Sequence, residues 1–350
     1  MKFKIKLLLI RIVFFNSYTM FSSELKEDED VILYPTYLYL DKSASEYKVK
    51  IHLHVFKKKE NSIKRKILIQ ELEKYLKVSD EDNSKIFQER IRSFLVDNKR
   101  GKKVSVRVLG QDYKLKETEA NGRSITEIKI PKKSILENTN QIEVNVNSSS
   151  RNKKEYKGKI WIIPEDSTCL ISDVDDTIKL SDVRNKKKLL ENSFIKPFEK
   201  ISGMNDYYIS LTSNVSCFLF VSASPWQMYN HLSKFFLDEK FPESIYFMKD
   251  IRLKDWSVLN LFESPDNYKI QKIEPILKEW KNVKFILVGD SGEKDPEAYA
   301  TLFRKYPDQI KKIYIRVAYD ENLEERIKRV FSGIEKDKYF FFKDPREIKE

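Results

Sequence analysis

The feature that most constrains the fold is the alternation of apolar runs and helical patterns after residue 167. The apolar runs occupy residues 168–173, 217–224, 283–291 and 310–317, and the helical patterns between them occupy residues 226–237, 270–280 and 296–306. Strands that are apolar throughout are usually buried on both faces, and their alternation with helices is typical of a parallel sheet covered by helices. We therefore predict an α/β domain over residues 166–350.

The region before this domain, residues 24–165, has a different pattern. Residues 47–56 alternate polar and apolar side chains, which predicts a half-buried strand. Further short β-rich segments, separated by turn residues, favour a sandwich. Between them, apolar residues recur at helical spacing over residues 61–97, which predicts two amphipathic helices. We expect a β-sandwich-like domain with a helical insertion.

The first residues have the order of a secretory signal. Three lysines lie within residues 1–6, residues 7–15 are apolar except for Arg11, and residues 16–23 are mostly small and polar. We predict a signal peptide at residues 1–23 and an exported or membrane-associated protein. An uncleaved anchor and a cytoplasmic protein bound at the membrane periphery are the alternatives.

The chain is basic, with 66 Lys and Arg against 54 Asp and Glu and a formal net charge of +12. Such a charge attracts anionic partners, including nucleic acid, acidic lipid surfaces and phosphorylated small molecules. The lysines are dispersed and no arginine-rich stripe is present, so specific nucleic-acid binding is not expected. A membrane surface is the preferred partner, and an ordinary solvated surface is the alternative.

Acidic residues follow two of the predicted strands. Asp173 ends the first apolar run and is followed by Asp175 and Asp176; Asp290 lies at the end of the third run, with Asp295 five residues later. In a parallel sheet these strand ends meet at one edge, where carboxylates repel one another unless a cation lies among them. Hard oxygen ligands favour Mg²⁺ over zinc. We predict Asp173, Asp175 and Asp290 as the metal ligands.

The same edge receives groups suited to a phosphate. Ser222 lies near the end of the second run and Lys269 begins a helical segment, so both are predicted to bind phosphate. Gly289 would let the backbone approach the phosphate or metal closely. Asp173 is the candidate nucleophile, which would form an aspartyl-phosphate. Asp175 would act as acid and then as base, with a pKa raised by the neighbouring acids.

Other residues near these motifs have plainer interpretations. Thr177 is expected to orient its loop. Asp176 is expected to cap the following turn, with a ligand role as the alternative. Asp295 either caps a helix or supports the metal site. Ser224 and Pro225 have the pattern of a helix start, with Ser224 as N-cap. Trp226 is expected in the core, with contact to a lipid chain as the alternative.

Two further pairs carry little functional signal. Cys169 and Cys217 lie in apolar runs, so we expect buried, unreactive thiols. His52 and His54 fall on one face of a predicted strand without a nearby carboxylate motif. We interpret them as a surface pair rather than as metal ligands.

The motifs together resemble those of a known superfamily. DVDDT, a downstream lysine and GDSGEKD, in this order, resemble the haloacid dehalogenase (HAD) superfamily of phosphohydrolases. SDVDDTIK, NSFIKPFEKISGM, FVSASPWQMY and LVGDSGEKDPEAY are similar to the actin-patch phosphatidate phosphatase catalytic family over about residues 167–317. The resemblance implies a HAD-like Rossmannoid sheet, with Asp173 as nucleophile, Asp175 as acid/base and Asp290 as magnesium ligand. It also implies conversion of phosphatidate to diacylglycerol and phosphate.

The sequence departs from that family at three positions. Tyr268 stands where a histidine is expected, and Glu293-Lys294 stands where Gln-His is expected. These changes affect substrate preference, so a soluble phosphomonoester phosphatase and a nucleic-acid end phosphatase are alternatives. A non-catalytic protein that binds membrane surfaces is an alternative from another class. Between Thr177 and Cys217 there is room only for a small cap, which predicts an open site suited to a membrane-embedded substrate.

Overall fold

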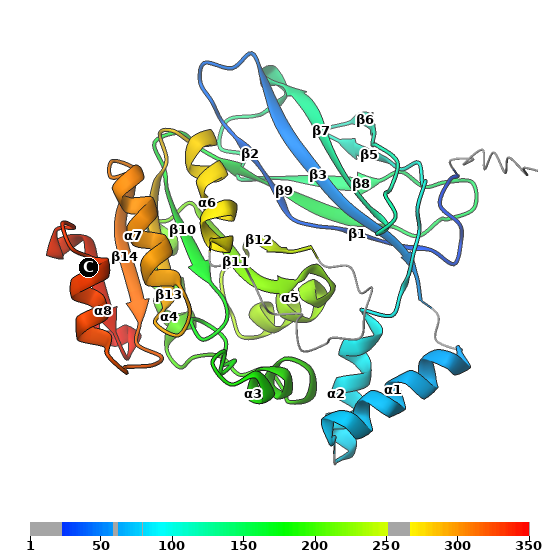
Figure 1. Ribbon diagram of the computed structural model, residues 1–350. Coiled ribbons are helices and arrows are strands. Elements are labelled where there is room, and N and C mark those ends of the chain that lie inside the picture. Colours follow the sequence, from blue (N-terminus) through cyan, green and yellow to red (C-terminus); the bar gives the residue numbers. More distant parts are fainter. Residues whose placement is uncertain (1–22, 59–61, 79, 251–266, 350) are drawn as a thin grey trace, which may run out of the picture.

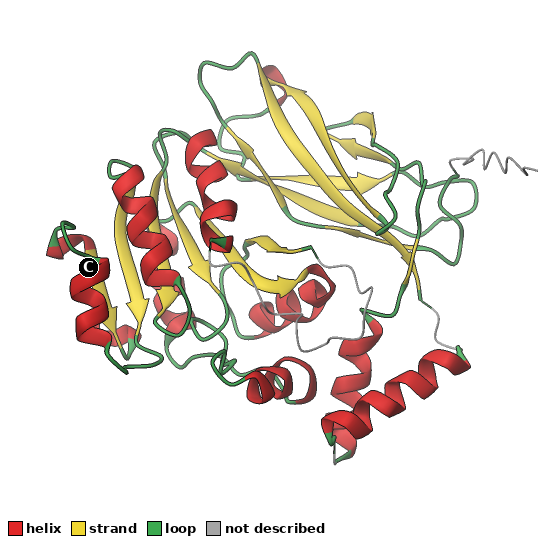
Figure 2. Ribbon diagram, in the orientation of Figure 1, coloured by secondary structure: helices red, strands yellow, loops and turns green. Residues whose placement is uncertain are grey.

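A computed structural model describes residues 23–58, 62–78, 80–250 and 267–349. It places a β-rich part, residues 23–163, against a part in which strands and helices alternate (Figures 1 and 2). Residues 1–22 of the predicted signal peptide lie outside the described residues. Among the helices that the structure describes, none is long and apolar enough to cross a membrane.

The second part contains a six-stranded sheet in the order β12-β11-β10-β13-β14-β15, with every neighbouring pair parallel. Its strands are β10 (Thr168–Asp173), β11 (Cys217–Pro225), β12 (Ile245–Lys249), β13 (Lys284–Asp290), β14 (Ile310–Arg316) and β15 (Tyr339–Phe342). The expected parallel α/β sheet is confirmed. The C-terminal segment contributes the edge strand β15, and β12 has no counterpart among the predicted strands.

Both faces of this sheet are buried, because successive side chains of a strand point to opposite sides. Leu170 of β10 packs in one core with α4 (Met204–Ser210) and α5 (Tyr229–Asp238). Ile171 packs in the other core with α6 (Tyr268–Glu279), α7 (Asp295–Lys305) and α8 (Leu323–Val330). Burial on both sides explains why the strands are nearly continuous apolar runs.

The β-rich part has two sheets, as the sandwich prediction requires. One has the order β1-β3-β4 with β7 paired to β3, and the other has the order β2-β9-β8-β5-β6. Their strands are β1 (Asp30–Leu33), β2 (Thr36–Tyr39), β3 (Glu46–Lys57), β4 (Asp97–Asn98), β5 (Ser105–Val108), β6 (Gln111–Lys114), β7 (Arg123–Pro131), β8 (Gln141–Val146) and β9 (Lys157–Ile163). Alternate residues such as Val49, Ile51, Val144 and Ile160 form the core between the sheets.

The helical insertion joins the two parts. Helices α1 (Ile63–Leu76) and α2 (Glu81–Arg92) lie between β3 and β4 in the chain, as predicted. Phe87 and Ile91 of α2 pack in the core of the α/β part, beside α5 and a π-helical turn at Glu191–Ile195. The side chain of Arg90 donates hydrogen bonds to the backbone carbonyls of Ser193, within that turn, and Lys196, directly after it. The insertion is therefore a structural contact between domains.

The interpretation of His52 and His54 as a surface pair is wrong. The ring of His54 lies 2.8 Å from Asn98 Oδ1, and the ring of His52 packs 4.9 Å from that of Trp226. Burial lowers the pKa of His52 to about 3 and that of His54 to about 4. The alternating pattern suggested one exposed face, but the α/β part covers that face of β3.

The two cysteines form a disulfide, so the expectation of free thiols is also wrong. β10 and β11 are parallel neighbours, and their register places Cys169 opposite Cys217 with the two Cα atoms 4.8 Å apart. This separation lies within the usual range for disulfides. The bond joins two strands that carry candidate site residues at their carboxyl ends.

The disulfide is expected to stabilise the fold by about 2–4 kcal/mol, because it closes a loop across 48 positions of the chain. Denaturant unfolding of the wild type with and without reductant measures this contribution. The control is the double variant Cys169→Ala, Cys217→Ala, whose unfolding midpoint should not respond to reductant. An equal response of both proteins would contradict the prediction.

Candidate functional site

The candidate site lies where the chain changes direction across the parallel sheet. From the central strand β10 the chain runs to β11 and β12 on one side and afterwards to β13, β14 and β15 on the other. Ligand sites in such sheets form at this switch point, beyond the carboxyl ends of the strands. Asp173 is the last residue of β10, Asp290 is the last of β13, and Asp295 begins α7.

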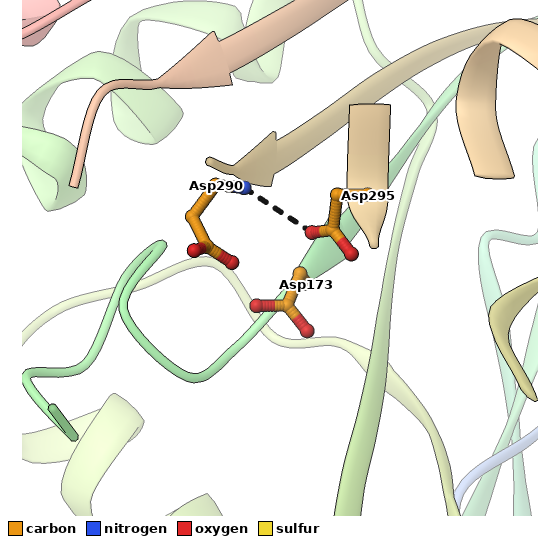
Figure 3. A group of neighbouring side chains, drawn as sticks. All are labelled: Asp173, Asp290 and Asp295. Carbon is orange, nitrogen blue, oxygen red and sulfur yellow. Dashed lines mark hydrogen bonds between the residues drawn. The ribbon is translucent and has the colours of Figure 1, made fainter. Parts of the chain in front are cut away.

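These three aspartates form one buried cluster (Figure 3). One carboxylate oxygen from each lies within 4.8 Å of the others. Asp173 is 1% exposed, and Asp290 and Asp295 are 0% exposed. Within the described residues, Asp290 Oδ2 has no hydrogen-bond partner although it is buried. A buried acidic group with an unpartnered oxygen is a site that could hold a metal ion.

The electrostatics of the cluster show an excess of negative charge. Burial raises the pKa of Asp173 well above its usual value, against the effect of Lys269, and the neighbouring acids add to the rise. Burial likewise raises the pKa of Asp290, with Asp295 as its strongest acidic neighbour. Among the described residues, Lys269 forms ion pairs with the cluster: its Nζ lies 2.8 Å from Asp173 Oδ1 and also pairs with Asp295.

A fourth acid approaches the same lysine. Glu293 Oε2 lies 3.5 Å from Lys269 Nζ, and burial raises the pKa of Glu293. The sequence had marked this position only as a departure from the resembled family. Within the described structure the Lys269 ammonium thus pairs with three acidic side chains, with Asp290 close by, and an added cation would relieve their repulsion.

Gly289 is required by Asp295. A Cβ atom at residue 289 would overlap Asp295 Oδ2 and come within 2.7 Å of Tyr299. The same Asp295 oxygen accepts a hydrogen bond from the backbone N–H of Asp290 at 3.2 Å. The close approach that the glycine permits is therefore to the side chain of Asp295, which belongs to the acidic cluster.

Asp175, expected as a metal ligand, lies outside this cluster. Its Oδ1 pairs with Lys179 Nζ at 3.1 Å and accepts a hydrogen bond from Ser181 at 2.7 Å. Its Oδ2 accepts hydrogen bonds from Ser222 at 2.9 Å and from Ser224 at 3.2 Å. Among the three clustered aspartates, Asp295 takes the place that the sequence had given to Asp175.

The pKa of Asp175 is lowered, whereas a raised value was expected. Burial alone would raise this pKa, but the ammonium of Lys179 and hydrogen bonds from Ser181, Lys179 and Ser222 outweigh burial. Lys179 was absent from the predicted site. Its signal in the sequence is a lysine between Ile178 and Leu180, four residues after Asp175. A charged residue in an apolar stretch indicates a buried counterion.

The loop after β10 is held by side chains of its own motif. The hydroxyl of Thr177 donates to Asp173 Oδ2 at 3.1 Å, which orients the candidate nucleophile. Asp176 accepts hydrogen bonds from the backbone N–H groups of Ser181, Asp182 and Val183, so the expected capping role is confirmed. The backbone of Asp176 is left-handed, with φ at 56°.

The expectation that Ser224 caps a helix is wrong. Strand β11 continues through Pro225, and α5 begins at Tyr229 after one 3-10 turn. The hydroxyl of Ser224 instead contacts Asp175. The buried carboxylate needs hydrogen-bond donors, which the sequence pattern of a helix start could not reveal. Trp226 is 8% exposed and lies in the core, as expected.

The site is more enclosed than the open site that was predicted from the small cap. Asp173, Asp175, Ser222, Lys269 and Asp290 are all buried. Arg184 reaches across from the segment after β10, and its Nε donates to the carbonyl of Gly292 at 3.2 Å. Contacts of this kind close the rim between β10 and β13.

Comparison with known proteins identifies the same region. Residues 168–317 match the family model for the catalytic domain of phosphatidate phosphatase APP1. The phosphatidate phosphatase APP1 of Saccharomyces cerevisiae is 40% identical over 151 residues, which are 42% of this chain and 25% of that protein. An uncharacterized protein of Schizosaccharomyces pombe is 30% identical over 207 residues, 57% of this chain and 34% of that protein. The chain thus spans about a third or less of the length of these relatives.

Replacing Lys179 by Met is expected to cost about 3–5 kcal/mol of unfolding free energy, because Asp175 would keep a buried charge without its partner. The double variant Asp175→Asn, Lys179→Met should recover much of this loss. Denaturant unfolding measures both. The exposed Lys114→Met is the matched control and should change stability by about 0.5 kcal/mol or less. Equal costs for the single and double variants would contradict the pairing.

Proposed function

We propose that this chain, whose residues 168–317 belong to the phosphatidate phosphatase APP1 catalytic family, is a Mg²⁺-dependent phosphatase that releases phosphate from phosphatidate. The observation that carries the proposal is the buried cluster of Asp173, Asp290 and Asp295 with Lys269 against Asp173. A nucleophile, a counter-charge and a metal-binding group meet there, where the carboxyl ends of β10 and β13 lie beside the starts of α6 and α7.

The residues present fit a magnesium ion. The cluster offers only carboxylate oxygens, the donors that Mg²⁺ prefers, and Asp290 Oδ2 lacks a hydrogen-bond partner in the described structure. Asp173, Asp290 and Asp295 would hold the ion. When bound, it would neutralise charge between the anionic nucleophile and the anionic phosphate. Lys269 would supply further positive charge beside Asp173.

The residues then support a two-step transfer. In the first step a carboxylate oxygen of Asp173 forms a bond to phosphorus, the bond from phosphorus to the ester oxygen breaks, and Asp175 gives that oxygen a proton. In the second step a water attacks the phosphorus and gives a proton to Asp175. The bond between phosphorus and Asp173 breaks, so phosphate leaves and both carboxyl groups return to their starting states.

The environment of Asp175 suits the second step directly, since its lowered pKa keeps it ionised and able to accept a proton. The first step needs its protonated form. A phosphate dianion bound beside Asp175 would raise its pKa, because like charges disfavour ionisation. Substrate binding itself thus favours the acid that the first step requires.

A soluble phosphomonoester is the second candidate substrate, and the enclosure of the site favours it. The reacting groups are buried, and Tyr268 donates a hydrogen bond to the carbonyl of Ser222 at 2.9 Å where the resembled family has histidine. Glu293 adds negative charge beside Lys269. These features change the surroundings of the leaving group but leave the proposed chemistry the same.

We also propose an exported or membrane-associated location. The disulfide between Cys169 and Cys217 supports it, because such bonds persist in oxidising compartments. The basic charge of the chain supports contact with anionic lipid surfaces.

Magnesium is expected to stabilise the wild type by about 2.7 kcal/mol at about a hundredfold excess over its Kd. In thermal unfolding, Asp290→Asn should lose this response. Without magnesium the same variant should be at least as stable as the wild type, because it removes one buried negative charge. The exposed Asp308→Asn is the matched control and should keep the response. A normal magnesium response in Asp290→Asn would contradict the site.

Asp173→Asn is expected to lower phosphate release by about 10⁴-fold or more, as loss of a nucleophile does in other enzymes. The assay compares phosphatidate vesicles with soluble phosphomonoesters and phosphorylated DNA ends, with magnesium and with chelator, and uses Asp308→Asn as control. Release confined to soluble esters would keep the mechanism and remove the lipid substrate. No release from any substrate by a folded wild type would favour the non-catalytic membrane-binding alternative.

A further inference from the structure

A cavity of about 610 Å³ lies at the junction of the two parts of the chain. Its walls come from β1, β3, the insertion helices α1 and α2, and the segment that begins α5. Figure 1 shows these elements meeting on the side of the α/β part where α5 lies. Its volume is in the range of small-molecule sites. The lining residues include neither the clustered aspartates nor Lys269, so the cavity is separate from the reaction centre.

The floor of the cavity is aromatic and aliphatic. Tyr34 and Trp226 pack with their ring centroids 4.4 Å apart, and Phe56, Ile69 and Leu95 line the same space. These side chains come from the β-rich part, the insertion helices and the α/β part. Because they are apolar, the floor would accept a hydrocarbon chain.

The remaining lining is strongly cationic. Among the described lining residues are six cations, Lys58, Arg65, Lys66, Lys85, Arg92 and Lys234, and one acid, Glu89. Lys85 pairs with Glu81 at 2.9 Å and Lys234 pairs with Asp238 at 2.7 Å. The other four cations form no ion pair within the described ranges of the chain. Their charge is available for an anionic group at the cavity.

Two buried polar atoms in the wall lack partners, and one of them, on Arg65, is a donor that an anion would satisfy. Arg65 Nη1 and Gln227 Oε1 are buried atoms that lack a hydrogen-bond partner in the part of the chain that the structure describes. A buried guanidinium nitrogen without an acceptor costs free energy, and an anion would satisfy it. The cavity thus combines an apolar floor with an unsatisfied cationic donor.

We propose that this cavity binds one molecule of an anionic phospholipid, with a hydrocarbon chain against the Tyr34–Trp226 floor and the phosphate group at Arg65 and the neighbouring lysines. Charge complementarity and the apolar floor select this occupant together. The lipid would hold the protein at a membrane, and Trp226 stands two residues after Ser224, which contacts Asp175. The bound lipid is a ligand and is not consumed.

The test uses Asp173→Asn protein and vesicles of equal amounts of phosphatidylcholine and phosphatidylglycerol with brominated chains. Phosphatidylglycerol is a phosphodiester, so binding is measured independently of phosphatase activity. Bromine should quench the emission of Trp226, and the Trp226→Phe background should lose that component. Vesicles of brominated phosphatidylcholine alone show whether binding needs the anionic lipid. Glycerol phosphate added as a competitor shows whether a free phosphate group occupies the same cavity.

Arg65→Gln is expected to weaken the apparent lipid affinity about tenfold, as loss of one charged hydrogen bond does. The exposed Arg151→Gln is the matched control and should bind as before. Val96→Phe, or Asn230→Phe if the first does not fold, should fill the cavity and abolish quenching of Trp226. Three results would each overturn the proposal. The first is equal quenching in proteins with Trp226 and with Trp226→Phe, and the second is equal lipid affinity in Arg65→Gln and Arg151→Gln. The third is full competition by glycerol phosphate.

Discussion

The contact between Lys269 and the aspartate cluster is the interaction on which the site depends. Three carboxylates lie buried at the ends of β10 and β13 and the start of α7, and the ammonium of Lys269 pairs with two of them. Burial of several like charges is costly, so the surrounding sheet must hold them in place. The parallel sheet, packed on both faces, is the rigid frame that does so. The excess of negative charge that remains makes this point suitable for a cation and for phosphate chemistry.

The sequence predicted the members of this site that follow from strand ends. Asp173 and Asp290 come directly after apolar runs, and parallel strands bring their ends to one edge, so their meeting needed only the fold class. The environment of Asp175 could not be predicted in the same way. It depends on a tight loop in which Asp176 is left-handed and Lys179 turns back to the carboxylate. A motif gives the order of residues but not the direction in which each side chain points.

Contacts between distant segments account for the other differences. The alternation in β3 correctly predicted a strand, but it could not show that the α/β part would cover His52. Cys169 and Cys217 became partners only because β10 and β11 are neighbours in a particular register. The hydrogen bonds from Arg90 to the carbonyls of Ser193, within the π-helical turn, and Lys196, directly after it, likewise depend on where the insertion docks. Each is set by tertiary structure, which local periodicity does not encode.

The disulfide has a further consequence for the segment between its two cysteines. The disulfide closes residues 169–217 into a covalent ring. Within this ring lie the candidate nucleophile, the loop with Lys179 and the small cap. A protease that cuts once inside this ring opens it without releasing either fragment. On a non-reducing gel the nicked chain would run at the position of the intact chain. It would separate into two bands only after reduction.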